Sequence, residues 1–520
     1  MRDPVLIRAP LAVLVSAALL AACAAGPDYE RPKNEVPDNW GAAASAVPAT
    51  APASAPVAAP ASAPAAAQPV KSTGDAGERW WSLYADPVLD RLEDEALSHN
   101  PTVQLAVANV LAARAQLGLT DANRYPTVTA NASQTRTKMS SVGTFPFPPG
   151  FNTTRDLTHI SVNASYELDL WGKYRRASES AQASLLAAQS SRDAAYLSLS
   201  AQVAQQYFAL LAYDAQEAAL QRALAGRQEM IALDRKKVEL GAMSDYDLHQ
   251  AEADEAAIRS QLAALAEARE KQEAAFAVLL GRSPREIMNG KVERGTPTLA
   301  DVWVPEGLPS DLLLRRPDVH AAEMNLVAMN AQIGVARAQY YPTVSLTGYL
   351  GQESSAFSQL FTGPARIFQF GVGATQPITD AIFGRTRYLV QGAEASRDAA
   401  LAQYRLAVAN AFADVRTALA EQSGARQILD AETARSTALG LAYRQSEVRY
   451  KVGMSSRLEV LDVEKNYLLA ELNRIDAQRA QRSAVADLFK AMGGGWKADS
   501  RQGTTGASQP PATHTVGQGG

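Results

Sequence analysis

The feature that most constrains this chain is an internal repeat. Residues 115–128 carry AQLG followed by RYPTV, and residues 331–344 carry AQIG followed by YYPTV, an offset of 216 residues. Further along, LWGK at 170–173 corresponds to IFGR at 382–385, an offset of 212. Two long stretches with matched order and nearly constant offset predict a duplicated unit whose two copies have kept the same layout.

Each copy contains a long stretch that is expected to be helical. The spans from Gly172 to Gly241 and from Gly384 to Gly453 are both 69 residues, and neither contains proline. At 1.5 Å per residue each helix would be about 100 Å long. Apolar residues recur every seven positions, the spacing of helices that pack side by side. They are Tyr196, Val203, Leu210, Leu224, Ile231 and Val238 in the first copy, and Leu401, Val408, Val415, Leu429, Tyr443 and Tyr450 in the second.

The two glycines that close these spans, Gly241 and Gly453, are predicted to be tight turns. A returning helix should follow each turn, at about 245–280 and 457–491, so that each copy forms a long helical hairpin. A further helix should precede each strand region, at about 102–124 and 318–340.

Pro126 and Pro342 mark where a helix ends, because proline lacks a backbone donor and biases the preceding residue to extended geometry. Alternating apolar and polar residues follow each proline and recur just before each long helix, which predicts one strand pair per copy, at about 126–171 and 342–380. The apolar members are Val128, Ala130, Ala132, Ile160, Val162, Ala164, Tyr166, Leu168 and Leu170, then Val344, Leu346, Gly348, Leu350, Phe368, Phe370, Val372 and Ala374.

These strand pairs have two interpretations. They could be hairpins of a soluble sheet with one wet face. Strands of about ten residues with a single apolar face are also typical of transmembrane barrels. Four strands cannot close a barrel, and open sheet edges are not tolerated in lipid. If the strands cross a membrane, several chains must share one barrel, and twelve strands from three chains is the smallest threefold solution.

The N-terminus predicts export. Residues 1–22 have the charged start, short apolar run and small-residue end of a signal peptide. The segment Leu20-Ala21-Ala22-Cys23 is similar to the bacterial lipobox, in which the cysteine is acylated and becomes the first mature residue. Cys23 is the only cysteine of the chain, so internal disulfides are excluded. The alternative is an ordinary signal peptide with an incidental cysteine.

Composition divides the chain further. A lipid-anchored segment is expected at 23–40, an Ala/Pro/Ser linker at 41–75, the first repeat at 76–295, the second repeat at 296–496 and a disordered tail at 497–520. The net charge of −4 argues against nucleic acid as a partner. The five histidines have no ligand spacing, and neither HExxH nor a P-loop is present. We therefore expect no enzyme activity, no catalytic or metal site, and no cofactor besides a covalent lipid on Cys23.

Several motifs together resemble a known family. They are Gly26-Pro27-Asp28-Tyr29 with Arg31-Pro32, Trp80-Trp81 with Asp86-Pro87, the doubled YPTV, and Leu314-Arg315-Arg316-Pro317-Asp318-Val319 with Ala322-Glu323. The chain is similar from about residue 20 to 495 to the outer membrane factors, in particular the lipoprotein branch serving multidrug efflux pumps of the resistance-nodulation-division type. The Ala/Pro/Ser linker departs from the usual pattern of this family.

The resemblance implies a homotrimer anchored in the outer membrane and extending into the periplasm. Its twelve-stranded barrel would cross the membrane, and its helices would form an α-barrel tunnel docked to a periplasmic adaptor and an inner-membrane pump. The expected function is a passive duct that exports drugs or other small molecules. A duct for metal ions or for type I protein secretion is an alternative, and a structural envelope lipoprotein is a non-transport alternative.

The periplasmic gate is expected at the glycine turns. By resemblance, Asp247, Glu459 and Asp462 match acidic residues that ring the tunnel end of related channels. Asp247 and Glu459 are also explained as first-turn carboxylates that cap a helix, whereas Asp462 lies beyond the cap and is the best single candidate. Tyr450 is a further candidate, although it also fits the last heptad position.

Arg315 and Arg316 raise the question of a binding site. The preferred interpretation is that Arg-Arg-Pro-Asp opens a helix, with Pro317 near its first position and Asp318 in its first turn.

Overall fold

The computed structural model describes residues 25–32, 79–140, 148, 150, 152–297 and 316–494. The predicted signal peptide, Cys23, the 41–75 linker, Arg315 and the 497–520 tail lie outside the described residues.

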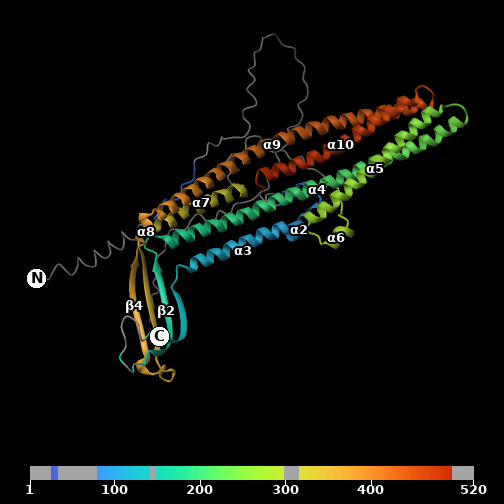
Figure 1. The fold of residues 1–520 in the computed structure, drawn as a ribbon. Helices are drawn as coiled ribbons and strands as arrows, with labels where there is room; N and C mark the ends of the chain where they lie inside the picture. Colours follow the sequence, from blue (N-terminus) through green and yellow to red (C-terminus); the bar gives the residue numbers. More distant parts are fainter. Residues whose placement is uncertain are drawn as a thin grey trace, which may run out of the picture. The chain divides into compact units, whose positions relative to one another are not determined.

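The chain alternates helices and strand pairs in the predicted order (Figure 1). The first repeat contains η1 (Trp80–Tyr84), α2 (Pro87–His99), α3 (Pro101–Ala122), β1 (Thr127–Lys138), β2 (Thr154–Leu168), α4 (Lys173–Glu239), α5 (Asp245–Leu279) and α6 (Pro284–Asn289). The second contains α7 (Pro317–Ala338), β3 (Thr343–Ser354), η3 (Phe357–Gln359), η4 (Gly363–Ala365), β4 (Arg366–Thr375), α8 (Ile378–Ile382), α9 (Arg385–Lys451) and α10 (Arg457–Ala491).

The duplication is exact in the lengths of the main helices. Helices α4 and α9 both have 67 residues, α5 and α10 both have 35, and α3 and α7 both have 22. The four predicted turn glycines adopt a left-handed conformation that other residues rarely take. Their φ angles are 74° at Gly172, 70° at Gly241, 74° at Gly384 and 77° at Gly453. The predicted helices and turns are therefore confirmed.

Within the described parts of the chain, every helix is too short or too polar to cross a membrane.

The strands begin directly after the two prolines. Helix α3 ends at Ala122 and β1 starts at Thr127, just past Pro126; helix α7 ends at Ala338 and β3 starts at Thr343, just past Pro342. All four strands form one antiparallel sheet in the order β1-β2-β3-β4 (Figure 1).

The register places the predicted apolar residues on one face of the sheet. Ala130 lies opposite Val162, Val162 opposite Leu350, and Leu350 opposite Phe368. Directly opposed residues project to the same side of a sheet, so these four form a row across all four strands. The side chains of Val162, Leu350 and Phe368 are 50%, 63% and 70% exposed. The single chain thus carries an uncovered apolar face on this sheet, as the alternation predicted.

The chain divides into two compact units, and each takes segments from both repeats. One comprises 1–34, 105–192 and 320–407, and contains the sheet; the other comprises 35–104, 193–319 and 408–520. The domain boundaries drawn from the repeats therefore stay a prediction.

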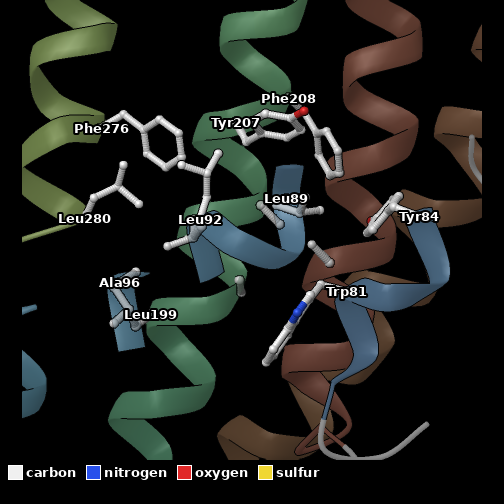
Figure 2. Packing of buried hydrophobic residues seen from close by; sticks show 14 of the residues in the cluster. Trp81, Tyr84, Leu89, Leu92, Ala96, Leu199, Tyr207, Phe208, Phe276 and Leu280 are labelled. Carbon is white, nitrogen blue, oxygen red and sulfur yellow. The ribbon is translucent and has the colours of Figure 1, made fainter. Parts of the chain in front are cut away.

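The second unit has an aromatic core around α2 (Figure 2). The Asp86 carboxylate accepts a hydrogen bond from the Val88 amide and caps this helix, whose first residue is Pro87. Helix α2 buries Leu89, Leu92, Glu93 and Ala96, the spacing of one helical stripe. The Tyr84 and Phe208 rings lie 4.6 Å apart between centroids. Burial of several such rings supplies most of the stability expected of this unit.

Candidate functional site

The two hairpin turns at which a gate was predicted have the same local structure. The Gly241 amide donates to the Val238 carbonyl and the Ala242 amide to the Lys237 carbonyl, at 2.9 and 2.8 Å. The corresponding bonds at Gly453 and Met454 are 3.0 and 2.8 Å long. This is the Schellman pattern, which satisfies the last helical carbonyls and requires a left-handed residue at the turn. Both long helices therefore end at a fixed point.

Serine caps start the returning helices. The Ser244 hydroxyl accepts from the Tyr246 amide, and the Ser456 hydroxyl accepts from the Glu459 amide at 3.2 Å. Asp247 and Glu459 lie in the first turns of α5 and α10, where a carboxylate is stabilised by the helix dipole. The capping interpretation of these two residues fits this geometry.

The structure places the predicted gate residues at one end of the hairpins but does not bond them together. Glu459 and Asp462 are exposed and Asp247 is half-buried. The Asp462 carboxylate accepts a hydrogen bond from Asn466, 3.3 Å away on the same helix. Among the described residues, none of the three carboxylates bonds to Tyr450. The single chain therefore leaves two of the three carboxylates accessible to other molecules.

Tyr450 instead belongs to a buried charged cluster. Its hydroxyl accepts from the Lys237 ammonium at 2.8 Å and donates to the Asp234 carboxylate at 3.3 Å. The other Asp234 oxygen lies 3.0 Å from Nε of Arg457, and these two side chains are 0% and 6% exposed. Tyr450 is thus more than a heptad packing residue, because it connects α9 to α4.

A second buried ion pair lies one heptad further along the same helices. Nη2 of Arg227 is 2.9 Å from the Glu464 carboxylate, and the side chains are 4% and 10% exposed. Burial raises the pKa of Glu464, and the neighbouring Arg227 opposes that rise. Asp254 of α5 lies 3.7 Å from Nη1 of Arg227.

The two ion pairs define how α4 and α10 pack. Arg227 and Asp234 are seven residues apart on α4, and Glu464 and Arg457 are seven apart on α10 in the opposite direction. This is the spacing of an antiparallel coiled-coil seam. The seam alternates in charge, with the cation on α4 in one layer and on α10 in the next. Charged residues on such a seam fix the alignment of its helices.

Sequence reasoning missed these four charged residues. Only apolar positions were used to find the heptads, so charges in the same register were treated as solvent-exposed. The signal that could have found them is that 227 and 234 continue the spacing of seven from Leu220, which is itself buried.

Arg316 serves the fold. Its guanidinium donates to the Asp414 carboxylate at 2.9 Å, the Asp318 carboxylate at 2.8 Å and the Ala491 carbonyl at 2.8 Å. Helix α7 begins at Pro317 with Asp318 in its first turn. The preferred interpretation of the Arg-Arg-Pro-Asp motif as a helix start is confirmed. In the described part of the chain, no three His, Cys, Asp or Glu side chains gather in a group that could hold a metal ion.

Comparison with known proteins adds to this geometry. A family model described as outer membrane efflux protein matches residues 92–282 and 308–494. The outer membrane protein OprJ of Pseudomonas aeruginosa is 32% identical over 94% of this chain and 96% of its own length. The cation efflux system protein CusC of Escherichia coli is 30% identical over 92% of this chain and 97% of its own length. Among solved structures, the CmeC outer membrane channel of Campylobacter jejuni superposes with a TM-score of 0.82 at 26% identity, covering 92% of this chain and 96% of CmeC.

Proposed function

Because the chain belongs to the outer membrane efflux protein family, we propose that it acts as a passive trimeric duct that carries small molecules out of the periplasm. The protein is an outer membrane channel of the efflux class. Its substrates would be delivered by a periplasmic adaptor and an inner-membrane pump, most simply one of the resistance-nodulation-division type. Binding, conduction and gating are then its tasks, and no chemical step is assigned to any residue.

The observation that carries this proposal is the exposed apolar face of the four-stranded sheet. Its row Ala130, Val162, Leu350 and Phe368 has no cover within the described chain. Strands β1 and β4 are the two edges of the sheet. In lipid, an open edge costs several kcal/mol for each unpaired backbone group. Three copies that pair β4 of one chain with β1 of the next would close a twelve-stranded barrel and remove every edge.

A structural envelope lipoprotein is disfavoured by the same observation. A brace between membranes needs helices and an anchor, but it has no use for a sheet of this length with one apolar face. Large exposed apolar patches mark surfaces that contact a membrane or another protein.

For the gate, we propose that the accessible carboxylates of Glu459 and Asp462, with Asp247, meet their counterparts around the threefold axis. Like charges held close together concentrate negative potential in a narrow opening and favour cations there. The buried cluster of Asp234, Tyr450 and Arg457 would hold the start of α10 in the closed position. This gives the exposed acids and the buried pairs separate roles.

Two substrate classes follow from the relatives. CusC is named for cation efflux, so a duct for metal ions is a second candidate beside one for organic small molecules. A duct for type I protein secretion is a more distant alternative. A tunnel that serves many cargoes carries no pocket for one of them, which places substrate selection in the pump.

The decisive experiment compares strains that lack this chain, the inner-membrane pump encoded beside it, or both. The proposal expects the single and double deletions to be equally sensitive to the same organic compounds. A strain without this chain that keeps wild-type resistance to all organic compounds but becomes sensitive to metal ions would favour the second candidate. Unchanged resistance to both classes would contradict an efflux role.

A further inference from the structure

The segment 25–32, which begins two residues after Cys23, is held in place along its length. The Ala25 amide donates to the Trp171 carbonyl at 3.0 Å, and the Asp28 carboxylate accepts from Nη2 of Arg176 at 2.6 Å. Trp171 directly precedes the turn into α4, and Arg176 lies in its first turn. The start of this segment is therefore fixed where the strands meet the helices.

The remaining contacts follow helix α7 in order. The Pro27 carbonyl accepts from Nδ2 of Asn330 at 3.1 Å. Further along, the Tyr29 hydroxyl donates to Oε1 of Glu323 at 3.2 Å, and Nη2 of Arg31 donates to Oε2 at 2.5 Å. The segment thus runs antiparallel to α7, with both carboxylate oxygens of Glu323 occupied at its far end. The Glu323 side chain is only 7% exposed, so these bonds compensate the burial of its charge.

Two glycines allow the segment to approach α7 closely. A Cβ added to Gly334 would lie 2.7 Å from the Ala25 carbonyl oxygen and 2.7 Å from Cγ of Arg176. A Cβ added to Gly26 would lie 2.5 Å from the Gly334 Cα, and Gly26 also has a φ of +107°. Both positions require glycine for the segment to lie where it does.

The internal repeat supplies a matched comparison. At the offset of 216 residues, Gly334 corresponds to Gly118, Asn330 to Arg114 and Glu323 to Val107. A Cβ on Gly118 would meet nothing within 4 Å. The duplication therefore produced two copies of the helix, but only the second copy carries the side chains that bind the segment.

From these contacts we propose that α7 of the second repeat is a binding site for the mature N-terminal peptide, with Glu323 as its latch. The site gives a role to two sequence motifs that the channel function left unexplained, Gly-Pro-Asp-Tyr with Arg-Pro and the Ala-Glu that follows Arg-Pro-Asp-Val. Its purpose rests on the proposed acylation of Cys23. Two residues span at most about 7 Å, so the docked segment holds the acyl chains beside Trp171. The lipid anchor then enters the membrane at the base of the strands.

Chymotrypsin cleavage after Tyr29 in the purified full-length channel tests the site. Because a folded site is cut only when it opens, the cleavage rate follows the undocked fraction of the segment. Tyr29→Phe keeps the cleavage site and removes one hydrogen bond to Glu323. Glu323→Ala removes both bonds of the latch, each to or from a charged group, and should raise the cleavage rate about tenfold or more.

Gly334→Ala should raise it by steric displacement, and Gly118→Ala is the matched control that should leave it unchanged. Cleavage after Tyr246, which is 74% exposed in the hairpin turn, reports whether a variant stays folded elsewhere. If Glu323→Ala accelerates both sites, Tyr29→Phe and Gly334→Ala decide the question. Equal cleavage after Tyr29 in Gly334→Ala and Gly118→Ala would overturn the binding site. Because no export is measured, loss of the segment's protection counts against this inference alone, and loss of export with intact protection counts against the channel proposal alone.

Discussion

Removing the charge of Asp234 should release the start of helix α10. Its carboxylate lies 3.0 Å from Nε of Arg457, and the two side chains are 0% and 6% exposed. None of the three guanidinium nitrogens of Arg457 has a hydrogen-bond partner within the described chain, so the ion pair with Asp234 is its compensation. Arg457 also stands at the first position of α10, where the helix dipole disfavours a cation.

The size of the effect follows from the burial of this pair. Removing one partner of a buried ion pair costs about 3–5 kcal/mol, because the other charge is left in a dry site. Every 1.4 kcal/mol changes an equilibrium constant tenfold, so Asp234→Asn should increase local opening by about a hundredfold to a thousandfold. The double variant Asp234→Leu with Arg457→Leu removes both charges and should recover most of the lost stability.

Amide hydrogen exchange of the purified channel measures this opening directly. The amides at 457–465 should exchange much faster in Asp234→Asn and return toward the wild-type rate in the double variant. Glu267→Gln is a matched control, because it removes one carboxylate from an exposed pair with Lys271. Such a pair is worth about 0.3–0.5 kcal/mol. Exchange in Asp234→Asn no faster than in Glu267→Gln, or a double variant as labile as the single one, would refute the reasoning.

Three further outcomes are expected. Both carboxylate oxygens of Glu93 are buried without a partner in the described chain, and burial raises the pKa of this group well above its usual value. Folding is therefore favoured by protonation: stability should rise as the pH falls from neutral through the raised pKa and decline as the pH rises, and Glu93→Leu should stabilise the protein by about 1–3 kcal/mol at pH 7 in denaturant unfolding; an unchanged midpoint would argue against it. Cys23→Ala should abolish fatty-acid labelling, and persistent labelling would contradict acylation. Glu459→Ala combined with Asp462→Ala should reduce cation selectivity in planar bilayers, and the same ion selectivity as wild type would exclude these carboxylates from the conducting opening.

Local chemistry made several elements predictable. Proline stops a helix whatever surrounds it, so Pro126 and Pro342 located the change from helix to strand to within a residue of β1 and β3. Glycine tolerates a left-handed turn, so Gly241 and Gly453 located the hairpin ends. The period of two in the strands identified the apolar residues that the sheet register then aligned.

The candidate site was only partly predictable. The capping serines and the acids behind them follow from neighbouring residues, and the structure places them as expected. Asp234 and Arg457 could not be paired from the sequence, because a charge at a heptad position is equally compatible with solvent and with a partner on another helix. Burial distinguishes the two cases, and burial depends on which helices pack together.

The sequence by itself determined the elements, their order, their duplication and the family to which the chain belongs, because each depends on residues close together along the chain or on whole motifs. Only the tertiary structure decided which charges are buried and which repeat carries the N-terminal segment. The contact between Tyr29 and Glu323 joins residues 294 positions apart. No local pattern encodes such a contact. Its free energy comes from two chain segments that desolvate each other only after the helices have packed.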